Sequence, residues 1–355
     1  NAIGGSATGI SVVDSNWNAI LGNFIGTTID GESASANETG VLVSGGVGNA
    51  IGGNLISGNG AVQVHLTGTG TQSNTLSDNL IGTNQDGGRI IPVSGNTVGV
   101  LIEDAPGNQV GPNNVVAGLT AGVYIAGASA TGNRVVGNDL GTNRAPSGTA
   151  GLGNTVGLYI NGAPNNTVGG AGADRNVISG NSQAGVYLFG GLASGNLILG
   201  NIIGLAPDGV TPFVKSTASG NAFVQSVGIA IVDASYNQIG GTSKSEGNVL
   251  TGNDMAGVYI LGHGNSSTGN VIRNNLIGLN ADGSRGVGNA QYGVLLVNAP
   301  NNKVVRRGPM ANRFSRNWAG DFRNYRGAEV PLTSLARHKA KARPRHPKHR
   351  IAIQA

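Results

Sequence analysis

Asn133-Arg-Val-Val-Gly-Asn-Asp-Leu-Gly141 is a nine-residue stretch whose pattern the chain repeats. Its skeleton is Asn-x-apolar-x-x-Asn-x-apolar-Gly, and four further copies begin at Asn18, Asn74, Asn196 and Asn270. A skeleton kept at this spacing indicates a repeat architecture, in which each repeat packs mainly against its neighbours. The repeat is therefore a better guide to the fold than the length of 355 residues.

A second repeated unit is a short strand signal of the form Gly-Val-x-Ile or a close variant. Its apolar residues alternate with a period of two, as in Gly122-Val-Tyr-Ile125, which is typical of a β-strand rather than a helix. Each signal leads either into the nine-residue skeleton or into Asn-x-Ile/Val-Gly-Gly, as at Asn49. The signal begins at Gly9, Gly40, Ala61, Gly99, Gly122, Gly157, Gly185, Gly228, Gly257 and Gly293.

The composition limits the classes of protein to which the chain can belong. The 63 Gly residues lack the Gly-X-Y period of collagen, and hydrophobic residues make up 39% of the chain, enough for a sizeable core. The absence of Cys excludes disulfides, thiolate metal sites and Cys nucleophiles. No apolar run approaches the roughly 18 residues of a membrane-spanning helix, so we expect no transmembrane segment.

The two repeated units together predict an all-β coil. Each turn contributes short strands whose inward Val, Ile and Leu stack on those of the next turn, with strands about 4.8 Å apart. Asn and the apolar residue two positions later share parity, so both are expected to point toward the interior or a corner. A buried Asn must have its amide satisfied. A column of Asn at one corner achieves this by bonding amide to amide along the axis.

These units resemble the parallel β-helix repeats of bacterial secreted and surface proteins, which belong to the pectin-lyase-like superfamily. The resemblance covers about residues 1–305 and implies a single right-handed parallel β-helix, which we predict to have about ten to eleven turns. A left-handed hexapeptide helix would need a sustained six-residue period, which the sequence lacks. For function the resemblance leaves lyases, hydrolases, epimerases, adhesins and proteins without known activity open.

After residue 305 the pattern degrades. Residues 306–336 still contain Asn312-Arg-Phe-Ser-Arg-Asn317 and are rich in aromatic residues, so we interpret them as an atypical capping turn over the end of the core. Residues 337–355 are predicted to be a disordered basic tail. At the other end, Asn1-Ala-Ile-Gly-Gly5 begins in mid-motif without Met. We therefore expect a truncated N-terminus, with any targeting signal upstream.

The charge is divided between the two parts of the chain. Residues 1–302 carry eight Lys and Arg against 15 Asp and Glu, a net charge of −7. Residues 303–355 carry 14 Lys and Arg against two acids, a net charge of +12. The basic tail is expected either to contact an anionic polymer or a membrane surface, or to be simply a solvated end of the chain. Because no aromatic residue lies between Arg337 and Arg350, specific nucleic-acid binding is not predicted.

Long loops always follow the nine-residue skeleton, and we expect them to emerge at one corner and line one side of the coil, where repeat proteins often bind. Four acids in these loops each precede Gly, which is a turn signal. A shared Ca²⁺ site would need several more oxygen ligands, so we predict no metal site. The loops cover residues 27–39, 83–97, 142–155, 205–227 and 279–291, and the acids are Asp30, Asp86, Asp208 and Asp282.

Catalysis in this superfamily uses carboxylates, alone or with Arg and Lys, on adjacent turns of one outer face. Paired carboxylates in glycosidic chemistry lie about 5–10 Å apart. Asp104 and Asp233 both end predicted strands, but four turns, or about 19 Å, separate them. Gly262-His263-Gly264 resembles the Gly-His-Gly of polygalacturonase-type hydrolases, although the companion Asn-Thr-Asp, Asp-Asp and Arg-Ile-Lys motifs are absent. We interpret His263 as a solvated loop residue and predict no catalytic residue and no cofactor.

Four tyrosines are the candidate ligand-binding residues, because they occupy the outward position of predicted strands. Exposed, spaced aromatic rings can form a platform for sugar rings. We favour a second interpretation, in which the rings shield the outer face of the sheet through stacking and cross-strand contacts. The four are Tyr124, Tyr159, Tyr187 and Tyr259.

The resulting hypothesis is a non-catalytic β-helix, secreted or at the cell surface, with a structural, adhesive or glycan-contacting role. Its expected partner is a polysaccharide or another cell-envelope polymer. The alternative is a polysaccharide lyase, hydrolase or epimerase acting on an acidic polysaccharide. Three or more acidic and basic side chains within about 10 Å on the long-loop face would favour the enzyme. A face dominated by Tyr, Asn, Ser and Thr would favour the binding role.

Overall fold

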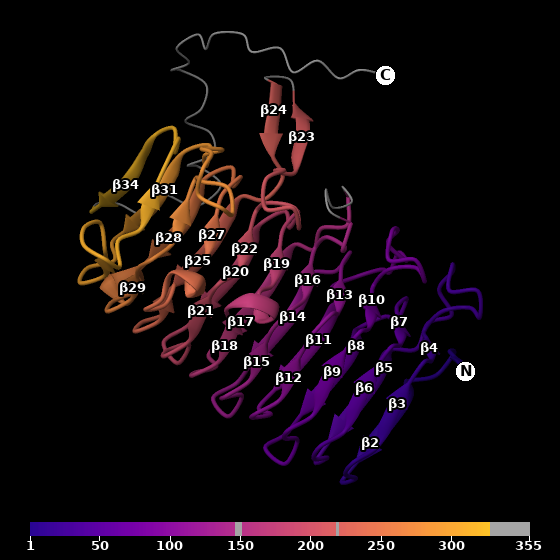
Figure 1. Cartoon of the computed structure of the whole chain (residues 1–355). Helices are drawn as coiled ribbons and strands as arrows, with labels where there is room; N and C mark the ends of the chain where they lie inside the picture. The colour runs from indigo at the N-terminus through magenta and orange to yellow at the C-terminus, as the bar shows by residue number, and fades with distance from the viewer. Residues whose placement is uncertain (146–150, 218–219, 327–355) are drawn as a thin grey trace.

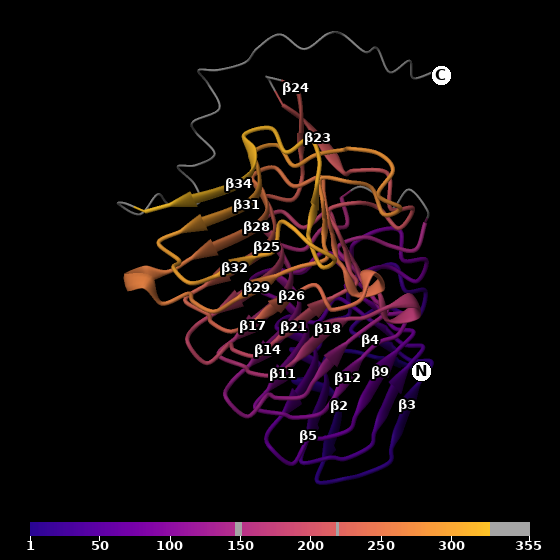
Figure 2. The same ribbon diagram turned by 60° about the vertical axis from the view of Figure 1, so that its left-hand side comes forward.

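The repeated units form the turns of a right-handed parallel β-helix in the computed structural model of the chain, which describes residues 1–145, 151–217 and 220–326. Each turn passes through three long parallel sheets in the order B, C, A (Figure 1). Figure 2 shows the strands of successive turns lying one above another. The predicted all-β class and handedness are confirmed, and the number of turns agrees with the prediction.

The strands of each sheet follow one another in chain order. Sheet A contains β1 (Ala2–Ile3), β4 (Phe24–Ile25), β7 (Leu55–Ile56), β10 (Leu80–Ile81), β13 (Val115–Val116), β16 (Asp139–Leu140), β19 (Val177–Ile178), β22 (Ile202–Ile203), β27 (Val249–Leu250), β30 (Leu276–Ile277) and β33 (Arg313–Phe314). Sheet B contains β2 (Thr8–Val13), β5 (Thr39–Ser44), β8 (Val62–Thr67), β11 (Val98–Glu103), β14 (Ala121–Ala126), β17 (Val156–Asn161), β20 (Ala184–Phe189), β25 (Val227–Val232), β28 (Ala256–Leu261), β31 (Tyr292–Val297) and β34 (Gly320–Tyr325). Sheet C contains β3 (Ala19–Leu21), β6 (Ala50–Gly52), β9 (Thr75–Ser77), β12 (Gln109–Val110), β15 (Arg134–Val135), β18 (Thr167–Gly169), β21 (Leu197–Leu199), β26 (Gln238–Ile239), β29 (Val271–Ile272) and β32 (Lys303–Val304).

Shorter elements sit at the corners. A two-stranded antiparallel hairpin of β23 (Val214–Thr217) and β24 (Gly220–Phe223) projects from one corner (Figure 1). The short 3-10 helices among the described residues are η1 (Gly172–Asp174), η2 (Lys244–Glu246) and η3 (His263–Asn265).

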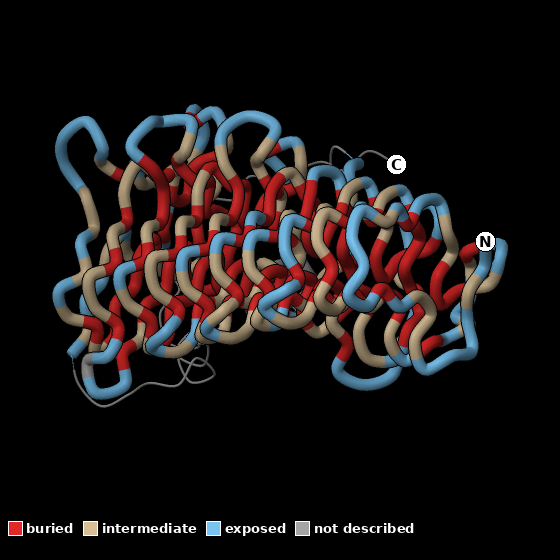
Figure 3. The backbone as a smooth tube through the Cα atoms, turned by 90° about the horizontal axis from the view of Figure 1, so that it is seen from below, coloured by how far each residue is buried: buried red, intermediate tan, exposed pale blue. Residues whose placement is uncertain are grey.

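The core is a set of apolar columns that run along the axis. In sheet B, Val123 pairs with Val100 on one side and with Leu158 on the other, and all three side chains are buried. Because side chains alternate between the two faces of a strand, every second residue enters the interior. Figure 3 shows this buried interior as a continuous band along the coil.

Asn columns hold the corners, and there are three of them rather than the single one predicted. Asn79 shows the pattern. Its amide nitrogen donates to the carbonyl oxygen of Ile51 and to Oδ1 of Asn114, both at 2.9 Å. Its own Oδ1 accepts hydrogen bonds from the backbone nitrogen of Asn54 at 3.0 Å and from Asn54 Nδ2 at 3.1 Å. Each Asn therefore satisfies backbone groups of its own corner and the side chain of the next turn.

The third column, between sheets A and B, shows what happens where Asn is missing. Gln225 takes the place of an Asn, and its Nε2 donates to Asn253 Oδ1 at 2.9 Å. At the C-terminal end, Asn317 Nδ2 donates to the carboxylate oxygen Oδ1 of Asp321 at 2.9 Å. Three side chains other than Asn therefore continue or end this column: Gln63 and Gln225, which are longer than Asn, and Asp321, which is charged.

The final Gly of the nine-residue skeleton lies against the backbone of the next turn at this corner, and in some copies, among them Gly26 and Gly141, also against the Asn of the third column. Gly141 has a positive φ of 85°, a conformation that favours Gly. A side chain at this position would collide with Oδ1 of Asn181 in the next turn. The skeleton therefore encodes a strand, a corner amide and a close approach between turns.

The last described turn continues two of the three sheets. Phe314 of β33 and Phe322 of β34 pack against the end of the core, and the guanidinium carbon of Arg306 lies 5.0 Å from the centre of the Phe322 ring. Trp318 is mostly exposed. Residues 327–336 of the predicted cap and the predicted tail, 337–355, lie outside the described residues.

Replacing one column residue should destabilise the coil strongly. Asn79→Ala removes the partners of Ile51 O and of two nitrogens of Asn54, all of them buried, so we expect a loss of about 2–5 kcal/mol in the free energy of unfolding. The measurement is urea unfolding monitored by circular dichroism. As a control, Asn96→Ala at an exposed position should change the free energy of unfolding by less than about 0.5 kcal/mol. Equal losses for the two variants would contradict this role of the columns.

Candidate ligand-binding face

Three of the four predicted tyrosines form a stacked row on the outer face of sheet B. Tyr124, Tyr159 and Tyr187 occupy matching positions on β14, β17 and β20. The ring centres of Tyr124 and Tyr159 are 4.8 Å apart with planes at 7°, and those of Tyr159 and Tyr187 are 5.1 Å apart with planes at 10°. These distances match the spacing of adjacent strands, so the register of the coil sets the stacking.

The row presents ring edges and hydroxyl groups to the outside. Each ring face inside the row is covered by the next ring, so the row differs from an open platform onto which a sugar ring could stack. Nδ2 of Asn161 donates a hydrogen bond to the Tyr124 hydroxyl at 2.9 Å. Burial, followed by the neighbouring Tyr187 and Tyr124, raises the pKa of Tyr159 to about 12. Its hydroxyl therefore remains a hydrogen-bond donor at neutral pH.

Tyr259 does not join the row, and the prediction that its ring is exposed is wrong. Ala230 of β25 lies between Tyr187 and Tyr259 in the register. Tyr259 is 0% exposed, although it points outward, and it belongs to an apolar cluster with Ala256 and Leu295. Alternation in the sequence shows that Tyr259 lies on the outer face of its strand. It does not show that apolar neighbours on that outer face bury the ring.

An Asp–His pair lies near the Tyr187 end of the row. Asp233 follows β25, and its Oδ2 is 2.7 Å from Nδ1 of His263, the first residue of η3 (His263–Asn265). Asp233 Oδ1 accepts hydrogen bonds from the His263 backbone nitrogen at 2.8 Å and from the Ser266 hydroxyl. Burial acts to raise the pKa of Asp233, but the hydrogen bonds from Ser266 and His263 outweigh it and hold the pKa below its ordinary value. Burial and then the charge of Asp233 raise the pKa of Tyr187.

His263 is therefore not simply a solvated loop residue. In the sequence, Asp233 is considered only as a partner of Asp104. Asp233 and His263 follow strands of adjacent turns, β25 and β28, which places them at one corner. Asp104 follows β11 and Asp233 follows β25, and these two strands lie four strand spacings apart in sheet B, as expected. Ser266 donates its hydroxyl hydrogen to the Asp233 carboxylate, whereas in a nucleophilic triad the hydroxyl donates to the imidazole.

A second His–carboxylate pair lies beyond the other end of the row. His65 Nε2 on β8 is 3.1 Å from Glu103 Oε2 at the end of β11. Asp104 follows, and its Oδ1 accepts a hydrogen bond from the backbone nitrogen of Ser129 at 3.1 Å. These groups lie beside Tyr124, since β11 and β14 are neighbours.

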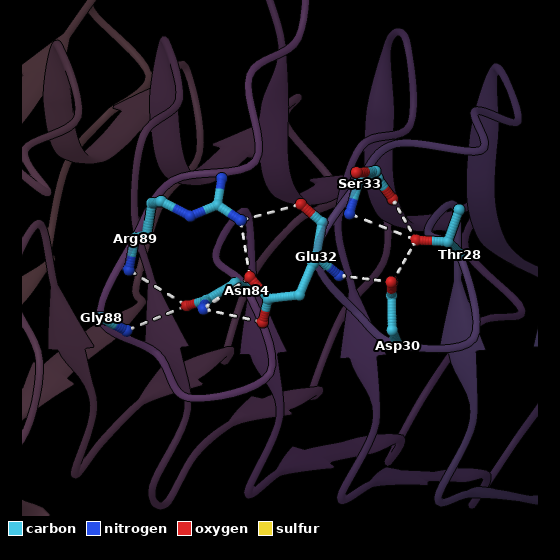
Figure 4. A network of polar contacts seen from close by, with 7 residues as sticks. All are labelled: Thr28, Asp30, Glu32, Ser33, Asn84, Gly88 and Arg89. Atoms are coloured by element: carbon cyan, nitrogen blue, oxygen red, sulfur yellow. Dashed lines mark hydrogen bonds and ion pairs between the residues drawn. The ribbon is translucent and has the colours of Figure 1, made fainter.

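The long loops emerge at the corner between sheets A and B, as predicted, and several of them begin with short hairpins. In the first two, the Glu32 carboxylate and Arg89 form an ion pair of 2.6 Å, and Asn84 Nδ2 donates to Glu32 Oε1 at 3.1 Å (Figure 4). Asp30 accepts hydrogen bonds from the Thr28 hydroxyl at 2.6 Å and from the Glu32 backbone nitrogen at 3.0 Å. Asp30, Glu32 and Arg89 thus bring two acids and a base together on the long-loop face, which is the arrangement expected to favour an enzyme, but turn and inter-loop contacts occupy all three side chains.

Asp139 is a buried carboxylate that the sequence interpretation missed. It faces outward from sheet A, between Val115 and Val177, at a skeleton position where the other copies carry Phe, Leu or Ile. That contrast was the available signal. Burial raises the pKa of Asp139 to about 6, and Arg144, whose Nε is 3.9 Å from Asp139 Oδ2, acts in the opposite direction.

Comparison with known proteins gives one family match and several distant structural likenesses. Residues 1–154 match the family model described as periplasmic copper-binding protein (NosD). No curated protein sequence matches the chain.

Three solved structures illustrate the likeness in fold. The Dettilon tailspike protein (gp208) is 14% identical with a TM-score of 0.42, and the match covers 88% of this chain and 61% of the tailspike chain. The A-module of the Azotobacter vinelandii mannuronan C-5 epimerase AlgE6 is 12% identical with a TM-score of 0.35, with 92% of each chain covered. PfbA, a surface adhesin of Streptococcus pneumoniae, is 11% identical with a TM-score of 0.21, with 84% of this chain and 82% of PfbA covered.

The family description raises the question of copper. Copper in proteins is bound mainly by imidazole, thiolate and thioether groups. The part of the chain that the structure describes contains no group of three or more His, Cys, Asp or Glu able to hold a metal ion. Among the described residues, none of the helices has the length and apolar character needed to cross a membrane.

Asp139 should make stability depend on pH. Because its pKa in the folded state lies above the ordinary value of 3.8, folding disfavours the ionised form, and the free energy of unfolding should fall as the pH rises from about 4 to beyond 6. A difference of two pKa units corresponds to about 3 kcal/mol. In urea unfolding, the free energy of unfolding of Asp139→Asn relative to that of the native chain should be about 2–3 kcal/mol higher at pH 8 than at pH 4.

The matched control is Asp174→Asn, which removes an exposed carboxylate paired with Arg134. It should show no comparable gain. A stability difference between Asp139→Asn and the native chain that stays constant from pH 4 to pH 8 would contradict the buried carboxylate.

Proposed function

We propose that the chain is a non-catalytic β-helix, secreted or at the cell surface, that contacts a glycan along the outer face of sheet B. The observation that carries the proposal is the stacked row of Tyr124, Tyr159 and Tyr187. It provides three half-buried phenol groups at the spacing of the strands. Aromatic side chains with one polar end are suited to surfaces that contact partly apolar, partly hydroxylated ligands.

The direction of the row suggests how a polymer would lie. The hydroxyls repeat along the helix axis, so an extended glycan parallel to the axis meets one phenol group per turn. The Tyr159 hydroxyl, like any tyrosine hydroxyl at neutral pH, can donate a hydrogen bond. The Asn161 amide adds a polar group beside the Tyr124 hydroxyl. Stacking and partial burial hold the rings in place before a ligand arrives, which lowers the entropic cost of binding.

The Asn columns support this role by making the surface rigid. Each tyrosine sits on a strand whose corners are fixed by hydrogen bonds along the axis, so the spacing of the rings follows from the spacing of the turns. A repeat protein of this kind can present one ligand group many times at constant geometry.

The test is binding of the full chain to a panel of soluble neutral, amine-bearing and uronate-bearing polysaccharides, with affinities measured by calorimetry. Tyr159→Ala should weaken binding at least about tenfold, because it removes the central ring and leaves two isolated ones. Tyr159→Phe keeps the stacking and removes only the hydroxyl, so it should fold normally and lose about threefold to tenfold. Trp17→Ala removes an aromatic side chain that is 79% exposed, four strands from Tyr124, and should leave binding unchanged. Glycan binding that Tyr159→Ala and Trp17→Ala affect equally would contradict the proposal.

A second candidate function rests on the Asp233–His263 pair beside Tyr187. Asp233 orients the His263 imidazole at 2.7 Å, and an oriented imidazole near a tyrosine with a raised pKa is suited to general acid–base chemistry. The corresponding activity would be that of a lyase, hydrolase or epimerase acting on a polysaccharide.

Turnover assays separate the two functions. Reducing-sugar release, formation of unsaturated products and epimer ratios should all stay at background for every glycan that binds. Turnover of any polyuronate that His263→Gln abolishes, while Tyr236→Phe leaves it intact, would establish the enzyme and overturn the non-catalytic proposal.

A further inference from the structure

We infer that the glycan taken by the tyrosine row is neutral or bears amino groups, and that polyuronates and other polyanions are disfavoured there. This inference rests on the proposed function and names the ligand class of the same row. The preference for ligand charge follows from the charged side chains around the row, and not from the tyrosines themselves.

Lys and Arg are absent from the strands that carry the row, and the two His residues nearby, His65 and His263, are paired with Glu103 and Asp233. Among the described residues, neither the sheet B strands from β2 to β31 nor the corners that lead from them into sheet C contain a Lys or Arg. Along sheet B the first Arg is Arg323 on β34, three strands beyond β25. The same strands and corners carry four acids: Asp14, Glu103, Asp104 and Asp233.

Three of these acids bracket the row. Glu103 is the last residue of β11 and Asp104 follows it, and β11 is paired with β14, the strand of Tyr124. Asp233 follows β25, which is paired with β20, the strand of Tyr187. Its charge reaches the row, since it contributes to the raised pKa of the Tyr187 hydroxyl. From β11 to β25 is four strand spacings, or about 19 Å, so one short oligosaccharide lying on the row meets acids at both ends.

This arrangement sets the preference for ligand charge. A uronate carboxylate on the row would face Glu103 and Asp104 at one end and Asp233 at the other, without an Arg or Lys on these strands to pair with it. His65 and His263 already contact Glu103 and Asp233, whereas Asp104 has no His partner among the described residues, so Asp104 carries most of this preference. An ammonium group at either end would be attracted by the same carboxylates. A neutral glycan would use the hydroxyls of the row and Asn161 alone. Complementary charge of this kind changes selectivity more than total affinity.

The experiment uses the full chain and three oligosaccharide probes of equal length: a glucosamine oligosaccharide, a neutral gluco-oligosaccharide and an oligogalacturonate. Calorimetry at low and at moderate salt should show the glucosamine probe binding most tightly, and salt should weaken only that probe, because screening acts on charge pairs. Asp104→Asn should weaken the glucosamine probe about threefold to tenfold and leave the neutral probe within about twofold. Asp86→Asn, at an exposed acid in a hairpin on the sheet A side, should change neither.

The outcomes separate this inference from the function on which it rests. If none of the probes binds in a way that Tyr159→Ala abolishes, both fail. If Tyr159→Ala abolishes binding of all three probes and the three affinities are equal, or if the oligogalacturonate binds best, the row binds glycans but the inference on charge is overturned. Oligogalacturonate binding that Tyr159→Ala leaves unchanged takes place away from the row and agrees with the inference.

Discussion

The amide–amide hydrogen bond between Asn side chains of successive turns is the interaction on which the rest of this structure depends. Sharp corners expose backbone groups that the sheet ladders cannot satisfy, and burying them unpaired would cost more than a typical hydrogen bond contributes. The columns satisfy them, as the four bonds of Asn79 show. They also fix how each turn lies on the next, so they determine the register of all three sheets.

That register positions the side chains on two outer surfaces, the face of sheet B and the corner between sheets A and B. On sheet B it places Tyr124, Tyr159 and Tyr187 at successive rungs, where their spacing is the spacing of the strands. At the corner between sheets A and B it brings hairpins of alternate turns within reach of one another, as the Glu32–Arg89 ion pair shows (Figure 4). The acids of the first hairpins therefore serve loop structure, whereas the side chains suited to a ligand gather on sheet B.

Sequence patterns predicted the fold well because its signals are local and repeated. Alternating apolar residues defined the strands, and the parity of Asn predicted buried columns, although not their number. The site was predicted less completely. The stacking of the three tyrosines follows from register between turns. The burial of Tyr259 depends on the apolar residues around it, and the pairing of Asp233 with His263 joins residues 30 positions apart. Asp139 was visible as an acid at an apolar position of the skeleton.

The central claim is that the tyrosine row is where a glycan binds, and ring-labelled NMR tests it most directly. The chain has seven Tyr, so a protein labelled with ¹³C in the tyrosine rings gives a small set of signals, assignable by Tyr→Phe variants. Titration with the glucosamine and gluco-oligosaccharide probes should shift the ring signals of Tyr124, Tyr159 and Tyr187 saturably, with the other four almost unchanged. Saturable shifts confined to tyrosines outside the row, or binding without any shift in the row, would contradict the account.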